Sequence, residues 1–357
     1  MLRTLAFLAV LLCARSAAPE DATWVQREGE VYGAQADASG PIGGGQGYAR
    51  IAAKGDFTVS DLDGLLKALG QAKAGQVVFI PGGAEIDCTA RVYIEKLAIV
   101  VPGGVTLASD RGAKGSQGAL ICSDALDTPA LVRAGGPDVR ITGLRIRGPN
   151  PKRYLDHHRR SFAEGRGSAY YYKFPTSDGI TTQHRRLQVD NCEISAFAHA
   201  GISLGQGDGH RVHHNFIHHC QYNGLGYGIS HDRASSLIEC NRFDWNRHSI
   251  AGTGRPGCSY VARNNVELGE SLSHCFDMHG GRDRKDGTDI AGTTIEIHHN
   301  TFRAPQPAVV IRGVPEETCA VHHNWFLRHA RPQQAVRAAA KTYTHDNAYG
   351  AEPKVVP

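Results

Sequence analysis

The sequence predicts an all-β parallel β-solenoid with a short helix that caps its N-terminal end. Three observations lead to this fold class: a segment that recurs seven times at a spacing near 23 residues, weaker copies of that segment upstream, and one amphipathic stretch before them. A repeat of this length is typical of one solenoid coil, because a single coil cannot bury its apolar face and stacked coils can. The 357-residue chain can therefore form one elongated domain.

Each copy of the repeat has an apolar residue, two variable residues, Asn or Cys, one variable residue, and a final apolar or aromatic residue. Asn side chains at one inward turn position can stack in a hydrogen-bonded ladder, which satisfies their buried amides. The spacings between ladder positions are 23, 26, 23, 36, 24 and 23 residues. The predicted ladder is Cys192, Asn215, Asn241, Asn264, Asn300, Asn324 and Asn347, and the final apolar positions are Ile194, Ile217, Phe243, Val266, Phe302, Phe326 and Tyr349.

The repeat also explains most of the conspicuous histidine pairs. The pairs at 213–214, 298–299 and 322–323 occupy the two variable positions before a ladder Asn. They are therefore expected on another side of the solenoid from the groove described below, in a mainly structural role. His218 and His219 lie in the segment that leads to the groove, so they keep a claim on function.

The stretch 57–75 (FTVSDLDGLLKALGQAKAG) has the pattern of an amphipathic helix. A helix at this place would cover the open end of the solenoid and protect its edge. The predicted organisation is a signal peptide at 1–18, an extension at 19–56, the solenoid at 57–350 with insertions at 147–178 and 280–292, and a tail at 351–357.

The first 18 residues resemble a secretory signal, with Arg3, a short apolar core from Leu5 to Leu12, and small residues before the predicted cleavage site. The protein is therefore expected to be secreted or periplasmic, and no later stretch is long and apolar enough to span a membrane. Eight cysteines remain after Cys13, and their spacing leaves buried free thiols and disulfides both open.

The formal charge is +4, and 19 histidines can add positive charge at mildly acidic pH. This balance is compatible with an acidic partner, although solubility explains it equally well. No basic stripe interleaved with aromatic residues runs along the chain, so nucleic-acid binding is not expected. The expected partner is an acidic polysaccharide, and the expected state is a monomer.

A groove is predicted on the strands that follow the ladder turns. Because strand side chains alternate between faces, inward Ile202, Leu225 and Ile250 leave only Gly, Ser, Ala and Thr pointing outward on three consecutive coils. The next coil presents Asp277 and His279. A smooth floor that ends in polar groups suits a long, flat polymer. The two insertions, one of them rich in Tyr, Arg and Lys, would provide the loops that bind sugars and their acidic groups.

The coil pattern over residues 57–350 resembles the right-handed parallel β-helix proteins of the pectate-lyase-like superfamily. The resemblance implies this fold, which carries lyases, hydrolases, epimerases and proteins without enzymatic activity. Two segments, GYGISHD at 226–232 and NRHSIAGTG at 246–254, also resemble the Tyr-Gly-Phe-Asp-Pro-His and Asp-Arg-His-Gly segments of alginate C5-epimerases. Tyr227 and the pair Arg247-His248 match that family. Its Asp and His fall on Ser230 and Asp232, with His231 one place away.

These residues predict a polysaccharide lyase or C5-epimerase that removes the C5 proton of a uronate. In this hypothesis Arg247 neutralises the carboxylate, and Asp277 orients a histidine or binds a cation. The base is His248 or His279, and the acid is Tyr227 or His231. The residues expected to bind substrate are Arg233, Asn246, Arg255, Arg282, Lys285 and Arg312.

Two other functions are compatible with the sequence. A glycoside hydrolase could use paired carboxylates such as Asp244 and Asp277, and a solenoid without catalytic activity could bind glycans or serve a structural role. The predicted lyase or epimerase reaction requires no cofactor, but calcium or another divalent cation is compatible with two sets of residues. These are His248, Asp277 and His279 for zinc, and Asp283, Asp286 and Asp289 for calcium.

Overall fold

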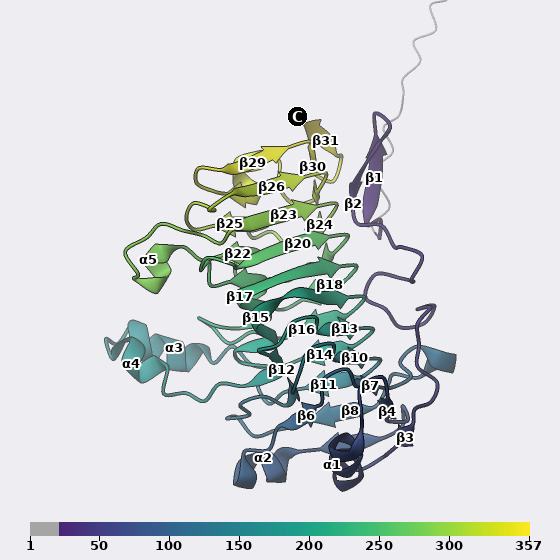
Figure 1. Cartoon of the computed structure of the whole chain (residues 1–357). Coiled ribbons are helices and arrows are strands. Elements are labelled where there is room, and N and C mark those ends of the chain that lie inside the picture. Colours follow the sequence, from purple (N-terminus) through teal and green to yellow (C-terminus); the bar gives the residue numbers. More distant parts are fainter. Residues whose placement is uncertain (1–20) are drawn as a thin grey trace, which may run out of the picture.

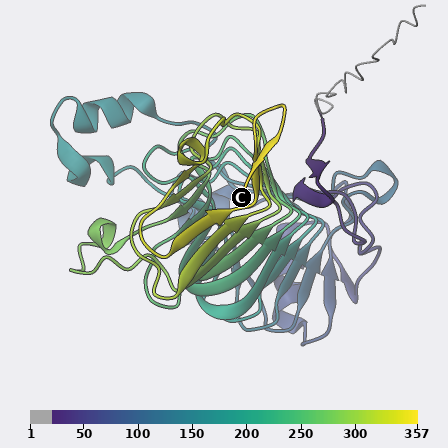
Figure 2. The ribbon, with the colours of Figure 1, turned by 90° about the horizontal axis from the view of Figure 1, so that it is seen from above.

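The computed structural model describes residues 21–357, so the predicted signal peptide at 1–18 lies outside the described residues. The chain forms the predicted right-handed parallel β-helix, with each coil hydrogen-bonded to its neighbours (Figure 1). Within residues 21–357, no helix is long and apolar enough to cross a membrane. In the end-on view the coils superimpose, two insertions project to one side, and residues 21–50 lie on the other (Figure 2).

The coils build three parallel sheet faces. The groove face contains β6 (Ile99–Val101), β9 (Val132–Ala134), β12 (Asp178–Thr182), the first halves of β15 (Ala200–His213) and β17 (Tyr227–Glu239), β19 (His248–Gly252), β22 (Phe276–Met278), β25 (Val309–Ile311) and β28 (Val336–Arg337). The second face contains β3 (Phe57–Thr58), β4 (Val77–Phe79), β7 (Thr106–Ala108), β10 (Arg140–Thr142), β13 (Gln188–Asp190), the second halves of β15 and β17, β20 (Ser259–Arg263), β23 (Thr294–His298), β26 (Thr318–His322) and β29 (Thr342–His345).

The third face closes each coil and continues into the C-terminal residues. Its strands are β5 (Glu85–Asp87), β8 (Leu120–Cys122), β11 (Arg145–Arg147), β14 (Glu193–Ser195), β16 (Phe216–His218), β18 (Arg242–Asp244), β21 (Val266–Glu267), β24 (Thr301–Phe302), β27 (Trp325–Phe326) and β30 (Asn347–Tyr349). The segment expected to be a tail after residue 350 adds β31 (Lys354–Val356), which pairs antiparallel with β30.

The helices lie at the solenoid end and in the insertions. The predicted capping helix is α1 (Leu62–Gln71), which begins where Asp61 accepts a hydrogen bond from the Gly64 amide. Its buried face, Leu65, Ala68 and Leu69, joins the solenoid core and covers the N-terminal coil (Figure 1). The remaining helices are α2 (Thr89–Glu95), the short η1 (Ala113–Gly115), α3 (Leu155–Phe162) and α4 (Gly167–Tyr171) in the first insertion, α5 (Gly281–Arg284) in the second, and α6 (Pro332–Ala335).

The asparagine ladder is present, with one correction. Asn215 donates its side-chain amide to Asn241 at 3.0 Å, and Asn241 donates to Asn265 at 3.0 Å. The predicted ladder residue Asn264 instead takes a left-handed conformation with φ 53°. The prediction was wrong by one position because two Asn residues are adjacent there. The ladder continues through Asn300, Asn324 and Asn347.

The corrected register changes the core of the same coil. Ala262 rather than Val261 is fully buried, and Glu267 rather than Val266 aligns with the aromatic column. Glu267 pairs in register with Phe243 on one side and Phe302 on the other. A glutamate therefore occupies a core position where the other coils place Ile, Phe or Tyr.

The histidine pairs of the repeat lie at the turn before each ladder position, and the second histidine of each pair is left-handed. His214, His299 and His323 have φ between 54° and 55°, and Cys240 and Asn191 occupy the same place in their coils with φ 54°. We call this row of turn residues the left-handed column. It faces the N-terminal strap, residues 21–50, which contains β1 (Trp24–Arg27) and β2 (Glu30–Gly33).

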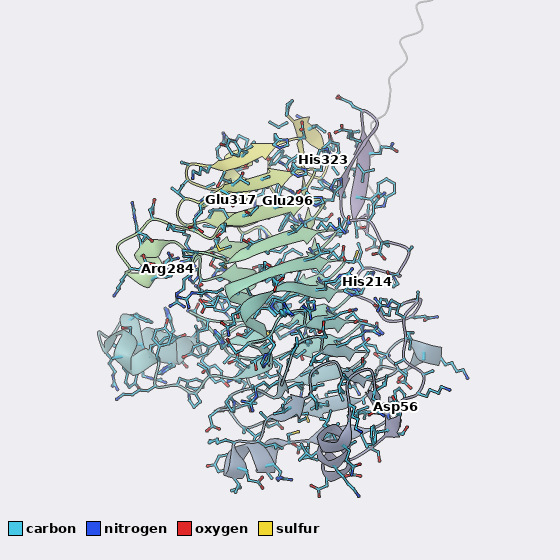
Figure 3. The ribbon with its side chains drawn as sticks, in the orientation of Figure 1. Asp56, His214, Arg284, Glu296, Glu317 and His323 are labelled. Carbon is cyan, nitrogen blue, oxygen red and sulfur yellow. The ribbon has the colours of Figure 1, made fainter. Side chains whose placement is uncertain are left out.

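The N-terminal strap lies against this column over several coils (Figure 3). The Nε2 atom of His323 is 3.1 Å from Glu30, and that of His214 is 3.1 Å from Asp37. At the other end of the strap, the Gly45 amide donates to the Asn191 side chain at 2.7 Å. The prediction that these histidine pairs lie away from the groove face agrees with the strand pairing, which puts them at the end of the second face.

All eight cysteines within residues 21–357 are free thiols, and all are buried. Of the two states that the sequence left open, the structure thus has small apolar thiols in the core. For example, Cys192 occupies the first ladder position, where its backbone amide donates to Asn215 at 2.9 Å.

Candidate active site

The outward side chains of the groove face form one straight column. In-register pairing places Arg133, Thr181, Ser203, Ser230, Ala251, Asp277, Val310 and Arg337 side by side on successive coils. The seven steps of about 4.8 Å give a column of roughly 34 Å. Its middle is formed by small side chains, and arginines lie toward both ends. Of the residues predicted for the smooth floor, Ser203 and Ala251 belong to this column, whereas Gly201, Ser249 and Cys275 are buried outside it.

A cavity of about 210 Å³ opens on this floor. Ser203, Ser230, Ala251 and Thr253 contribute small groups to it. Tyr227, His199 and His279 contribute groups that can exchange a proton. The cavity lies over the first halves of β15 and β17, between strands that carry the two insertions.

Tyr227 faces this cavity because the strand bends beside it. The glycines 179, 201 and 228 stack on consecutive coils, and a Cβ atom on any of them would lie 2.3 to 2.9 Å from a neighbouring backbone oxygen. The in-register pairing skips Gly228, so the simple alternation that would turn Tyr227 into the core is interrupted. Tyr227 packs with Ala200 and Ala251 outside the main core, and its ring stacks on His248 at 5.8 Å.

His199 and Asp178 form a hydrogen-bonded pair at the edge of the same cavity. The Nδ1 atom of His199 is 2.7 Å from Asp178, and its Nε2 atom makes no hydrogen bond with any residue of 21–357. Burial lowers the pKa of His199, but the hydrogen bond and charge of Asp178 outweigh it and raise the pKa above its ordinary value. The His199 ring meets the Tyr227 ring edge-on at 5.7 Å. This is the arrangement of a base oriented by a carboxylate.

Asp277 is the centre of a second group of polar residues. Its side chain is fully buried, and Arg312 binds both of its oxygens at 3.0 and 2.5 Å. The Nε2 atoms of His279 and His274 lie 2.8 and 3.0 Å from the carboxylate, and that of His248 lies 4.0 Å away. Three imidazoles and a guanidinium thus surround one carboxylate beside the cavity.

The charges in this group shift its pKa values strongly. Burial alone would raise the pKa of Asp277, but His274, His279 and Arg312 lower it well below its ordinary value. Burial also lowers the pKa of His248 far below its ordinary value, although Asp277 opposes this shift. Burial raises the pKa of Tyr227, with Arg247 opposing and Asp277 adding to the rise.

The structure brings together four of the six predicted catalytic residues. Tyr227, His248, Asp277 and His279 lie in one cluster. The Arg247 side chain donates to the Leu225 carbonyl at 3.2 Å. His231 lines the same cavity as Tyr227 and His279, but both of its ring nitrogens are engaged, with Nε2 2.6 Å from the Ser236 hydroxyl and Nδ1 3.2 Å from the Ala251 carbonyl. Burial lowers the pKa of His231 to about 4.

The predicted substrate-binding residues have different surroundings. Arg312 holds Asp277, as described above, and also binds Asp283 at 3.1 Å. Arg255 pairs with Asp232 at 2.7 Å at the cavity margin. The Asn246 side chain is fully buried and points into the solenoid. It accepts a hydrogen bond from the Cys220 amide and donates one to the Ile217 carbonyl. Arg233, Arg282 and Lys285 are exposed.

Sequence reasoning missed His199 and Asp178 and gave His274 no role. His199 directly precedes Ala200, which is the in-register partner of Tyr227, and Asp178 is the next partner along. Aligning the groove strands with one another, rather than the ladder turns alone, would have placed these residues together. His274 lies two residues before β22, the strand that carries Asp277, and this proximity in the sequence could have placed it in the site.

The two carboxylates of the hydrolase alternative do not face each other across the groove. Asp244 ends β18 on the third face, whereas Asp277 lies in β22 on the groove face. A pair of carboxylates that flank one glycosidic bond must share a face of the groove. The structure gives no support to this pair as an acid and its partner.

Two groups of side chains within residues 21–357 have donor atoms close enough together to hold a metal ion. One is His248, His274 and Asp277 in the candidate site, and the other is Asp37, His214 and Cys240 under the N-terminal strap. The carboxylates considered for calcium are instead bound to basic residues. Asp283 pairs with Arg312, Asp286 with Arg284, and Asp289 lies 3.8 Å from Arg282.

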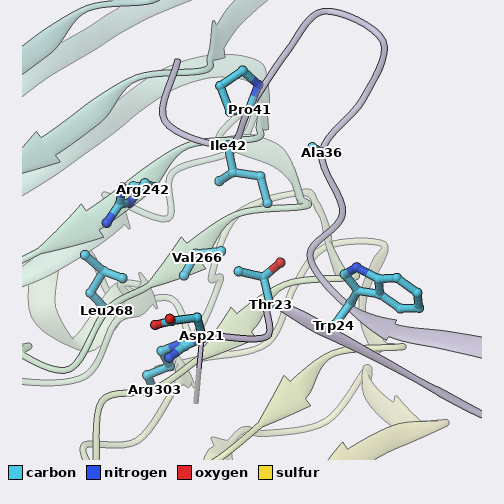
Figure 4. Close-up of a pocket in the computed structure, with 10 residues that line it drawn as sticks. All are labelled: Asp21, Thr23, Trp24, Ala36, Pro41, Ile42, Arg242, Val266, Leu268 and Arg303. Carbon is cyan, nitrogen blue, oxygen red and sulfur yellow. The ribbon is translucent and has the colours of Figure 1, made fainter. Parts of the chain in front are cut away.

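A second cavity, of about 440 Å³, lies under the N-terminal strap and away from the groove face (Figure 4). Trp24, Pro41 and Ile42 of the strap and Val266 and Leu268 of the third face give it apolar walls. None of the predicted catalytic residues lines it. The groove cavity is smaller, but it alone of the two contains an oriented histidine and a tyrosine hydroxyl.

Comparisons with known proteins identify similar folds only. No family model matches the chain, and no curated protein matches it. Among solved structures, an alginate lyase from Paenibacillus sp. str. FPU-7 is 13% identical with a TM-score of 0.46, covering 82% of this chain and 98% of its own. A family 28 exopolygalacturonase from Yersinia enterocolitica is 11% identical with a TM-score of 0.41, and the match covers 81% of this chain and 74% of the exopolygalacturonase. A pectin methylesterase from Aspergillus niger is 11% identical with a TM-score of 0.37, and the match covers 85% of this chain and 88% of the esterase.

Proposed function

We propose that this protein is a polysaccharide lyase or C5-epimerase that acts on a uronate-containing glycan by removing the C5 proton. The observation that carries the proposal is the pairing of an oriented histidine, His199 held by Asp178, with the Tyr227 hydroxyl at one cavity in a small-residue groove. Elimination and epimerisation each need a base and a proton donor near the same sugar carbon. The residues at this cavity provide both.

The groove is suited to an extended anionic polymer. Its floor is made of Thr, Ser and Ala over several coils, and Arg133 and Arg337 flank the outward column. Arg247 adds positive charge beside the cavity, where it donates to the carbonyl of Leu225, a cavity-lining residue, whereas the charge of Arg312 is paired with Asp277 and Asp283. A uronate carboxylate must be neutralised before its C5 proton becomes acidic, and guanidinium groups do this through charge-assisted hydrogen bonds.

In the proposed reaction, Nε2 of His199 takes the C5 proton, and the electron pair of the C5–H bond forms the C4–C5 double bond as the C4–O bond breaks. The Tyr227 hydroxyl donates a proton to the leaving glycosidic oxygen. If the C4–O bond stays intact and a proton returns to C5 on the opposite face, the product is the epimer. Asp277 and Arg312 position His279 and the rim of the cavity.

The lyase outcome is tested by incubating the protein with a panel of uronate polymers and following the ultraviolet absorbance of unsaturated uronate ends. On the polymer that reacts, Tyr227→Phe and His199→Gln are expected to lower kcat at least 100-fold. The matched controls are Tyr343→Phe, an exposed tyrosine on β29, and His345→Gln, which breaks a His–Asp pair far from the groove. A full rate in both cavity variants would contradict the assigned roles.

The solenoid without catalytic activity remains the second candidate because the groove alone is suited to glycan binding. The two are distinguished by the same panel. Binding of a polymer without unsaturated or epimerised product from the folded wild-type protein would favour a binding protein.

A further inference from the structure

We propose that His248, His274 and Asp277 form a binding site for a divalent transition-metal ion of the zinc class. The three side chains come from two adjacent coils of the groove face: His248 begins β19, and the other two flank the start of β22. Their donor atoms all lie within 4.8 Å of one another. Two imidazoles and a carboxylate are a ligand set that zinc accepts, with a further coordination position left for another group.

The orientation of His248 is that of a metal ligand. Its Nδ1 atom lies 2.6 Å from the His274 carbonyl, so Nδ1 carries the proton and the Nε2 lone pair points to the cluster. Histidines that bind metals commonly donate the other ring N–H to a backbone carbonyl, which fixes the tautomer. The centroids of the His248 and His274 rings lie 3.9 Å apart, and their Nε2 atoms lie 4.0 and 3.0 Å from Asp277.

The Nε2 atom of His248 has no hydrogen-bond partner within residues 21–357. Nε2 of His274 and of His279 lie 3.0 and 2.8 Å from Asp277, whereas Nε2 of His248 is buried 4.0 Å from it. His248 itself is fully buried. A buried nitrogen without a partner is costly, so the Nε2 atom of His248 needs an explanation. A bound cation would satisfy the lone pairs of His248 and His274 together.

The surroundings of the carboxylate also agree with this assignment. Arg312 binds both oxygens of Asp277 and leaves the opposite side of the carboxylate toward the histidines. Such an outer hydrogen bond orients a metal-binding carboxylate. His279 lies 2.8 Å from Asp277 but outside the compact group of three, so it is placed beside the ion.

The position suggests what the ion would do, and this part rests on the proposed function. The Tyr227 ring stacks on His248 at 5.8 Å and borders the groove cavity, so an ion at this site would add positive charge next to the substrate carboxylate. Metal binding itself does not depend on that reaction, because it is measured without any glycan.

The test measures metal content of the full-length protein after treatment with a chelator and dialysis against Zn²⁺. We expect the wild-type protein to bind Zn²⁺ at this site, and His274→Gln and Asp277→Asn to lower the affinity at least tenfold. Cys240→Ser is the matched control, because it removes a donor from the other group under the N-terminal strap and should leave this site loaded. Thermal unfolding checks that each variant is folded.

A second measurement keeps the test decisive if Asp277→Asn does not fold. Co²⁺ bound by two imidazoles and a carboxylate has visible d–d absorption without an intense thiolate charge-transfer band, and this spectrum is expected for the wild-type protein. No bound Zn²⁺ in the wild type, full affinity in folded His274→Gln, or loss of the ion only in Cys240→Ser would each overturn the proposal. Activity on uronate polymers is measured separately, so failure of the metal site and failure of the proposed function are distinguished.

Discussion

Glu267 shows how one residue in this solenoid departs from the rule of its repeat. It is fully buried in the aromatic column, and burial raises its pKa to about 8, with Asp244 adding to the shift and Ser249 opposing it. The folded chain therefore keeps a proton that the unfolded chain releases near pH 4.5. Since the folded state binds more protons between these values, the free energy of unfolding falls as pH rises from about 4.5 to 8.

The substitution Glu267→Gln tests this directly. Gln keeps the shape of Glu and carries no charge. The variant's free energy of unfolding should therefore exceed that of the wild type by a small amount at pH 5 and by on the order of 3 kcal/mol at pH 7.5. Urea unfolding at both pH values measures the difference. The exposed neighbour Glu270, changed to Gln, should give no such gain. An equal difference at pH 5 and pH 7.5 would show that the carboxyl is not protonated in the fold.

The His199–Asp178 pair makes a prediction about the pH dependence of activity. His199 acts as a base only when neutral, so kcat/KM should rise as pH increases through its raised pKa. Asp178→Asn removes the charge that raises this pKa. The rise should then move to lower pH, and the plateau should fall by about 100-fold as the ring loses its orientation.

The pH profile of kcat/KM on the reactive polymer is the measurement. Tyr227, Asp232 and His279 face the same cavity, so the position of the rise is compared between wild type and variant rather than read as one residue's value. Asp346→Asn, at the His345–Asp346 pair on the opposite part of the coil, is the control. An unchanged profile in Asp178→Asn would remove His199 from the role of base.

The asparagine ladder is the feature that joins neighbouring coils. Asn241 accepts from Asn215 and donates to Asn265 and to the Val212 carbonyl. Replacing Asn241 with Leu leaves several buried backbone and amide groups without partners, so it should lower the free energy of unfolding by roughly 3 to 5 kcal/mol. Guanidinium unfolding measures the loss.

The control for the ladder is Asn223→Ala, because the Asn223 side chain makes no hydrogen bond with any residue of 21–357. It should change the unfolding midpoint little. If Asn241→Leu were as stable as Asn223→Ala, the ladder would not be a source of stability. A decrease of less than about 1 kcal/mol in the free energy of unfolding of Asn241→Leu would lead to the same conclusion.

At this scale the sequence predicted the coils well and the groove less well. The spacing of Asn215, Asn241 and Asn300 fixes the period because each amide can bond only to the equivalent position of the next coil. The adjacent pair Asn264 and Asn265 left a choice of register, which only the pairing of β20 with β23 resolves. Tyr227 could not be placed by alternation, since the bend at Gly228 depends on the backbone of the next coil.

Across the whole molecule, the N-terminal strap joins coils that are far apart in the sequence. Contacts such as that of Glu30 with His323 join residues 293 positions apart, and no local sequence pattern predicts them. The histidine pairs were visible in the sequence as part of the repeat, but their partners on the strap were not. The site shows the same limit: Tyr227, His248 and Asp277 were singled out, whereas the pairing of Asp178 with His199 depends on the stacking of two coils.

Gly44 tests whether the strap is firmly held. Its φ is 67°, and an added Cβ would lie 2.3 Å from the His214 carbonyl and 2.5 Å from the Asn191 side chain. Gly45 has a similar φ of 87°, but its Cβ would meet no atom closer than 3.9 Å. Both variants have the same kind of backbone strain, but only Gly44→Ala also adds a steric clash. Gly44→Ala should therefore lower Tm and speed proteolysis of the strap more than Gly45→Ala does. Equal effects would mean that the strap does not lie against the left-handed column.

The central claim is that this groove removes the C5 proton of a uronate, and isotope exchange tests it most directly. The wild-type protein is incubated in D₂O with the uronate polymers, and the products are analysed by mass spectrometry and NMR. The account predicts deuterium at C5 for an epimerase or unsaturated ends for a lyase, with either product lost in Tyr227→Phe and retained in Tyr343→Phe. Folded wild-type protein that produces neither deuterium at C5 nor unsaturated ends on any uronate polymer would contradict it.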